Sequence, residues 1–349
     1  MDGEKRLSLN AVGWIYAYLH FSVEVACFFL LFSRFAESPA WWGIALLFDA
    51  LAFLTQPFFG ALADRFPRVR FGAVGAVLLL LALGMPWKYP AFVLMTLGNA
   101  LVHVDGAEAT LRGAEGKLTP SALFVGGGSF GVILGQLLGK NAGTLTGLFP
   151  IGFMAVSLAL LLWLPARLDR EAGADGFEKS APSTLPTGTL ILLSFFVTAC
   201  RSYIGYAVPM SWNNTVTLNI TLFSVMGFGK MLGGFFADCF GAKKVGVLSL
   251  LASVPFLVFG DRAALVSLIG VTLFSMTMSI TLALIVSRLS DAPGFAFGIT
   301  TVALFCGVAP AFFFVPHGVL AQGITVTVLA LLAAGALALC FGRKKDEQR

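Results

Sequence analysis

The sequence predicts an all-α membrane protein whose twelve transmembrane helices form two pseudo-symmetric six-helix bundles. The first observation is composition: 58% of the 349 residues are hydrophobic and only 12% are charged, whereas soluble domains carry about 25% charged residues. The second is the length of the apolar segments, about 20 residues each, without the alternating polarity of a β-barrel. The third is a short motif that occurs once in each half of the chain. Soluble, disordered and fibrous proteins are excluded.

Twelve apolar segments separated by short polar turns are the expected transmembrane helices. In the first half they lie at 10–34, 40–63, 71–86, 90–110, 119–140 and 146–165. In the second half they lie at 187–210, 215–238, 245–260, 263–287, 293–315 and 318–341. An even number of spans places both ends of the chain on the same side of the membrane.

The basic residues support this topology and give its orientation. With both ends on one side, seventeen Lys and Arg fall in the loops and tails of that side, and four fall on the other. Because cytoplasmic loops carry the excess of basic residues, we expect both termini to be cytoplasmic. The basic residues are dispersed over short loops and do not form a stripe, so we expect no nucleic-acid partner.

A polar segment with two prolines lies in the middle of the chain and has the composition of a flexible linker. We expect an N-terminal bundle at 1–165, a cytoplasmic linker at 166–187 and a C-terminal bundle at 188–349. The halves repeat a motif of glycine, aspartate and basic residues at the end of the second and eighth spans. The first copy holds Gly60, Asp64, Arg65 and Arg68, and the second holds Gly234, Asp238 and Lys243.

These features resemble the major facilitator superfamily, whose hallmark loop has the form G-x-x-x-D-R-x-G-R-R/K, with a weaker copy in the second half. The chain departs from this pattern at Pro67 and at Cys239. The resemblance implies a central cavity lined by spans 1, 4, 7 and 10, with alternating access from the two sides. It also implies that the loop aspartates meet helix N-termini and that the arginines bind acidic residues across the interface.

A narrower resemblance is to the fosmidomycin resistance proteins of that superfamily. The matching fragments are His20–Glu24, Gln56–Gly60, His103–Ala107, Gly126–Gly131 and Arg201–Ser202. Two departures occur: the first fragment ends in glutamate where that family has aspartate, and the third lacks a proline after its histidine. The resemblance implies proton-driven export of a small organic solute or drug across a bacterial cytoplasmic membrane.

Ionisable side chains inside the spans mark the candidate cavity, because each costs at least about 2.5–3.5 kcal/mol at the bilayer centre. His20 and Glu24 are four residues apart and share one helix face, so they form either a proton site or a pair that locks the first span to a neighbour. Arg201 cannot lose its charge, so it contacts either an anionic substrate or a carboxylate such as Asp49 or Glu24. His103 in the fourth span is a further cavity candidate.

Other charged residues in the spans are expected to be structural. Asp105, Glu108 and Arg112 lie at i, i+3 and i+7 on the fourth span, so they form one stripe toward its cytoplasmic end. We interpret this stripe as a salt-bridge ladder at an inner gate. We expect Lys230 to extend its side chain along the helix, so that its ammonium group reaches the cytoplasmic interface.

A stripe of small residues, Gly127, Gly131 and Gly135, recurs every four positions on the fifth span and predicts close packing of another helix. Drug–proton antiporters of the superfamily often carry a Gly-Pro motif here, but in this chain Gly131 is followed by Val132. The incomplete motif keeps an alternative to drug export open.

The features together predict secondary active transport by alternating access, because no phosphate-binding loop is present to supply another energy source. The leading hypothesis is proton-coupled export of a small organic solute or drug. The alternatives are proton-coupled uptake of a small organic anion held by Arg201, and a receptor or lipid-handling scaffold that transports nothing. No nucleophile–base pair, cofactor loop or metal-ligand spacing is seen, so we expect no enzymatic activity, cofactor or metal. The expected partners are a small-molecule substrate, protons and the bilayer, and we expect a monomer.

Overall fold

The computed structural model describes residues 7–164, 168 and 172–342, and all regular structure within these ranges is helical. The first half contains α1 (Leu9–Phe35), α2 (Trp41–Leu54), α3 (Gln56–Arg65), α4 (Phe71–Gly84), α5 (Lys88–Leu111), α6 (Thr119–Lys140) and α7 (Thr144–Trp163). The second contains α8 (Phe177–Ser180), α9 (Thr187–Ala207), α10 (Val216–Phe240), α11 (Ala242–Phe259), α12 (Ala264–Ser275), α13 (Met278–Val286), α14 (Pro293–Ala311) and α15 (Val319–Cys340). The predicted all-α class is confirmed for the described residues.

Among the described residues, ten helical segments are long and apolar enough to cross a membrane, so the chain is a multi-pass membrane protein. Two of the ten are the pairs α2–α3 and α12–α13, each broken within one span. Helices α4 and α5 occupy the positions of the third and fourth expected spans. However, α4 has only 14 residues, and the 24-residue α5 carries His103, Asp105 and Glu108. The count of twelve spans therefore stays a prediction.

The break between α2 and α3 has a local cause. Pro57 lies in the first turn of α3, the position where a missing N–H interrupts no helical hydrogen bond. Thr55, at the break, donates its hydroxyl to the carbonyl oxygen of Leu51 at 2.7 Å. A Cβ on Gly298 of α14 would meet the backbone of Pro57, so the break lies where this span packs against the second half of the chain.

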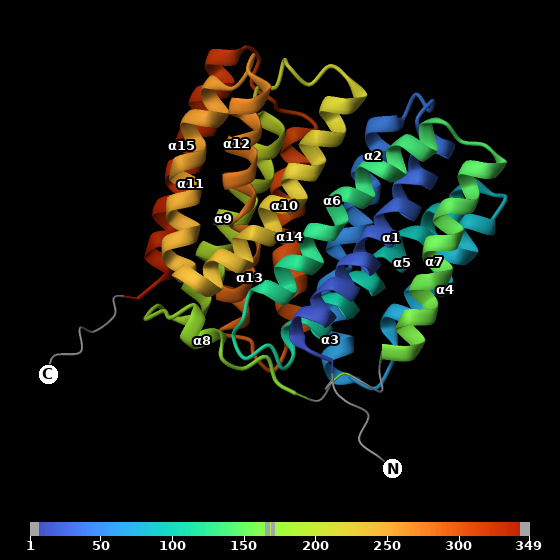
Figure 1. The fold of residues 1–349 in the computed structure, drawn as a ribbon, viewed down its shortest axis with the longest axis horizontal. Coiled ribbons are helices and arrows are strands. Elements are labelled where there is room, and N and C mark those ends of the chain that lie inside the picture. The colour runs from blue at the N-terminus through green and yellow to red at the C-terminus, as the bar shows by residue number, and fades with distance from the viewer. Residues whose placement is uncertain (1–6, 165–167, 169–171, 343–349) are drawn as a thin grey trace, which may run out of the picture.

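The two halves of the chain form two groups of helices that lie side by side. Figure 1 shows α1–α7 in one group and α9–α15 in the other. The groups meet where α6 packs against α10 and where α14 packs against α2 and α3. The predicted linker, 166–187, lies partly outside the described residues, and its described part includes α8. The proposed bundle boundaries stay a prediction.

The glycine stripe of α6 packs directly on α1. A Cβ built on Gly127 would meet the carbonyl oxygen of Ala17, and one built on Gly131 would meet that of Phe21. Gly135 continues the stripe one turn further along the same contact. Small side chains let the two backbones approach this closely. The contact fixes the position of α1, which carries two of the candidate cavity residues.

Candidate functional site

A cavity of about 370 Å³ lies between the two groups of helices. Its wall is contributed by α1, α2, α5 and α6 from the first half and by α9, α10, α13 and α14 from the second. The polar side chains in the wall are His20, Glu24, Asp49, Asn99, His103, Ser129, Gln136, Ser202, Tyr206, Lys230 and Thr301. A mostly apolar cavity of this size with a few converging polar groups is the usual form of a small-molecule site.

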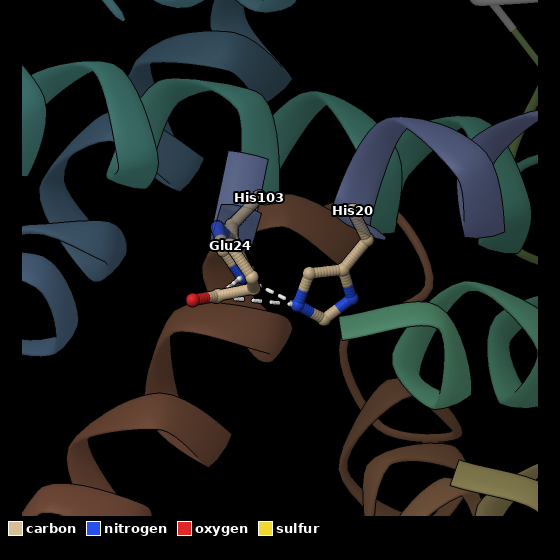
Figure 2. Close-up of side chains that lie close together, drawn as sticks. All are labelled: His20, Glu24 and His103. Carbon is tan, nitrogen blue, oxygen red and sulfur yellow. Dashed lines mark hydrogen bonds and ion pairs between the residues drawn. The ribbon is translucent and has the colours of Figure 1, made fainter. Parts of the chain in front are cut away.

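His20, Glu24 and His103 line this cavity, and Figure 2 shows that their side chains lie close together. The Nε2 atoms of the two histidines are 2.9 Å apart. The Glu24 carboxylate oxygen Oε1 lies 3.3 Å from Nε2 of His103 and 3.5 Å from Nε2 of His20. His20 and Glu24 share a face of α1, as their spacing predicts. The structure adds His103 from α5, 83 residues further along the chain.

Each imidazole of this cluster is held from its other side by a backbone carbonyl. Nδ1 of His20 lies 2.8 Å from the carbonyl oxygen of Phe124, and Nδ1 of His103 lies 2.8 Å from that of Asn99. A carbonyl oxygen only accepts hydrogen bonds, so both Nδ1 atoms donate. In a neutral ring, Nε2 is then an acceptor, and the two acceptors face each other.

Gly128 on α6 makes room for the His20 ring. A Cβ at this position would fall on the Nε2 and Cε1 atoms of the imidazole. We expect Gly128→Ala to displace the ring of His20 and to cost about 1–3 kcal/mol through overpacking. The displacement is measured by the ¹⁵N chemical shifts of the imidazoles. The control is Gly152→Ala on α7, where no heavy atom lies within 4 Å of the added methyl group, and equal shifts in both variants would contradict the prediction.

Two positive charges lie beside the cavity. Lys230 lines it and donates from Nζ to the Ser129 hydroxyl at 2.9 Å. Arg201 is 8% exposed; its Nη2 contacts the sulfur of Met278, and its guanidinium lies 5.9 Å from the centre of the Phe274 ring. The Nε atom of Arg201 is buried and has no hydrogen-bond partner among the residues that the structure describes. Neither cation forms an ion pair with a carboxylate of the described residues, so the pairing that the sequence leaves open for Arg201 is not formed here.

The hallmark aspartates join the two halves at the end of the molecule where α1 begins and α15 ends, here called the terminal end. Asp64 at the end of α3 accepts hydrogen bonds from the N–H groups of Gly294 and Phe295, at 3.0 and 2.8 Å, in the first turn of α14. Asp238 at the end of α10 accepts hydrogen bonds from two N–H groups at the start of α6, at 2.7 and 2.9 Å. Free N–H groups and the helix dipole make an N-terminus favourable for a carboxylate. The two halves are thus joined at the terminal end by two equivalent contacts.

The other hallmark residues lie around these contacts. A Cβ on Gly60 would meet the backbone of α14, and one on Gly234 would meet a side chain of α6. Both glycines therefore permit the approach that the aspartates require. The basic residues Arg65, Arg68 and Lys243 are exposed at the same end.

The charged stripe of α5 extends the contact at Asp64. Nη2 of Arg112 lies 3.0 Å from a carboxylate oxygen of Asp64 and 3.0 Å from one of Glu108. The predicted pairing within the helix is therefore seen between Glu108 and Arg112. Asp105, one turn deeper, accepts a hydrogen bond from the Tyr16 hydroxyl on α1 at 2.8 Å.

Sequence reasoning missed part of the cavity wall. It places Lys230 near the membrane interface, whereas the structure places it beside Ser129 in the cavity. The sequence did signal a role for this residue, because Lys230 lies within the eighth expected span, eight residues before its end at 238. Ser129 and Asn99 carry no such signal, because uncharged polar residues occur throughout helices that pack on one another.

Comparison with known proteins finds similarity at the level of the fold. No protein-family model and no curated protein sequence matches the chain. The human organic anion transporter MFSD10 (TETRAN) superposes with a TM-score of 0.68 at 17% identity, covering 95% of this chain and 100% of the other. The E. coli fucose:proton symporter FucP superposes with a TM-score of 0.59 at 15% identity, covering 95% and 99%. Both similarities are at the level of the fold, and they agree with the all-helical transporter fold that the sequence predicts.

Proposed function

We propose that the chain is a secondary active transporter that moves a small organic anion through the central cavity by alternating access. The observation that carries the substrate class is the pair of cations, Lys230 and Arg201, beside the cavity. Neither has an acidic partner among the described residues. A buried charge without a counterion is costly, and an anionic ligand in the cavity removes that cost. The organic anion named for MFSD10 agrees with this class.

The contacts between the halves at the terminal end support alternating access. The two contacts there join opposite halves through Asp64 and Asp238, and each consists of hydrogen bonds to one helix N-terminus. Such contacts break and re-form without unpacking either half, which is what rocking of two rigid repeats around a central site requires.

We propose that a proton gradient drives transport, as the sequence predicts and as in the symporter FucP. The resemblance to the fosmidomycin resistance proteins favours exchange of the solute for protons, whereas symport is the alternative. The two are separated with vesicles loaded with a labelled anion and an internal pH dye. As the anion leaves, an exchanger carries protons in and lowers the internal pH, whereas a symporter raises it.

The anion proposal is tested in the same vesicles with paired probes of equal size: monocarboxylates, sulfonates and phosphonates, each beside its neutral ester or amide. We expect Lys230→Gln to slow anion movement about 10–100-fold, because a hydrogen bond to a charged group contributes about 1.5–3 kcal/mol. Lys230→Arg restores the charge and part of the rate. Arg201→Lys is expected to weaken transport of anions and to leave neutral probes unchanged.

The matched control is Lys140→Gln. Lys140 is an exposed lysine and the last residue of α6. It should leave the rates unchanged. If Lys230→Gln slows anionic and neutral probes equally, or if no anion of the panel moves, the proposed substrate class is wrong.

A further inference from the structure

We propose that His20, Glu24 and His103 form a binding site for one divalent transition-metal ion of the zinc class in the wall of the cavity. The proposal goes beyond transport of an organic anion and does not depend on it. It also departs from the sequence-based expectation of no metal site. That expectation rested on spacing along the chain, whereas the third ligand comes from another helix.

The atoms that converge in this cluster are all of a kind that binds metal ions. Because both Nδ1 atoms donate to backbone carbonyls, both Nε2 atoms offer lone pairs when the rings are neutral. The Glu24 carboxylate offers a third lone pair within 3.5 Å of each. Three acceptors face one another, and a positive ion among them is needed to make the arrangement favourable.

The distances between the three atoms match those between the ligands of one metal ion. Zinc binds imidazole nitrogen at about 2.0–2.1 Å and carboxylate oxygen at about 2.0–2.2 Å, so ligands that subtend roughly 90–110° at the ion lie about 2.9–3.5 Å apart. The three observed separations are 2.9, 3.3 and 3.5 Å. One ion in the middle can therefore reach all three atoms without movement of the helices.

A metal ion suits the three ligands better than a proton does. A single proton on Nε2 of His103 is divided between Nε2 of His20 at 2.9 Å and the Glu24 oxygen at 3.3 Å, so at least one of these two hydrogen bonds is weak. A metal ion binds all three ligands at once. The hydrogen bond from each Nδ1 to a carbonyl is also the outer-shell contact that orients histidine ligands in metal sites. Two imidazoles and one carboxylate suit zinc, cobalt or nickel better than magnesium or calcium, which prefer oxygen.

The site is reachable and lies within one half of the protein. All three ligands line the cavity, so an ion enters from it and keeps an open coordination position toward it. His20 and Glu24 belong to α1 and His103 to α5, both in the first half. The ion therefore stays bound whether or not the two halves move apart.

The test uses the full-length protein, purified with a tag that contains no histidine, stripped with a chelator and titrated with ZnCl₂ in a calorimeter. We expect one zinc ion per chain. Co²⁺ in place of zinc should show the visible absorption of a site with nitrogen and oxygen ligands. His103→Ala should weaken zinc binding at least tenfold, because loss of even an outer-shell partner costs about 10–100-fold.

Two matched controls are available in the chain. His317→Ala removes the remaining histidine, which is exposed, and should leave binding unchanged. Glu24→Gln keeps the size of the side chain and should lose affinity, whereas Asp49→Asn, in the same cavity wall, should not. Melting temperatures measured without metal verify that the variants are folded. Zinc binding of equal strength in the parent, His103→Ala and Glu24→Gln proteins, or no saturable binding at all, would overturn the proposal without affecting anion transport.

Discussion

Replacing Gly131 by leucine is expected to prevent α1 and α6 from packing and thereby to abolish stable folding of the first half. A Cβ at this position already falls on the carbonyl oxygen of Phe21 and lies 2.8 Å from the Cβ of Glu24. Overpacking of a core costs about 1–3 kcal/mol when side chains can move aside. Here the obstacle is the backbone of a helix, so the cost is larger. Because α1 supplies His20 and Glu24, ligand binding should be lost as well.

The measurement is the yield of monodisperse protein and its melting temperature in detergent. The matched control is Gly152→Leu on α7, an exposed glycine where no heavy atom lies within 4 Å of an added Cβ. Gly131→Ala should fall between the parent and the leucine variant. A leucine variant of Gly131 that melts at the temperature of the Gly152 control would show that α1 and α6 do not depend on this contact.

Removing both hallmark aspartates, Asp64→Ala with Asp238→Ala, is expected to open the terminal end. A capping side chain contributes about 0.5–2 kcal/mol, so the closed arrangement loses about 1–4 kcal/mol when both are absent. Arg112 also loses one of its two carboxylate partners. Because each 1.4 kcal/mol is about a tenfold change in an equilibrium, the ratio of molecules open at this end to closed ones should rise by about 5-fold to several hundred-fold.

The opening is measured as the distance between spin labels at Lys117→Cys and Lys243→Cys, in a chain whose five native cysteines are replaced. Both lysines are exposed at the terminal end. Lys117 directly precedes Leu118, which donates to Asp238, and Lys243 lies five residues after Asp238. The control is Asp291→Ala, an exposed aspartate just before α14. It should leave the distance distribution unchanged. A double variant with the same distribution as this control would mean that the aspartates do not hold the end closed.

The helices were predictable to a large extent because their causes are local. A helix or a broken pair of helices lies at the position of each expected span, since runs of apolar residues and the polar turns between them are read directly from the sequence. The short α4 and the charged α5 show the limit of this reasoning. The apolar length of a segment does not reveal how much of it other helices cover, and α5 keeps Asp105 and Glu108 buried inside the protein.

The candidate site was predictable only in part. Charged residues in apolar spans pointed to His20, Glu24, His103 and Arg201, because each is costly in a bilayer without a role. Which of them meet could not be read from the sequence. Lys230 joins the cavity because α10 packs on α6, a contact between residues about 100 positions apart.

By itself, the sequence determined the membrane class, the helices, the repeated hallmark loops and the pairing of His20 with Glu24, because periodicity and neighbouring residues set these features. Only the tertiary structure decided three further features: that His103 completes a cluster of three, that Lys230 and Arg201 form no ion pair with a carboxylate of the described residues, and which helix each hallmark aspartate caps. The physical reason is the same in each case. These contacts join helices far apart in the chain, and their distances depend on how whole helices pack rather than on any local pattern.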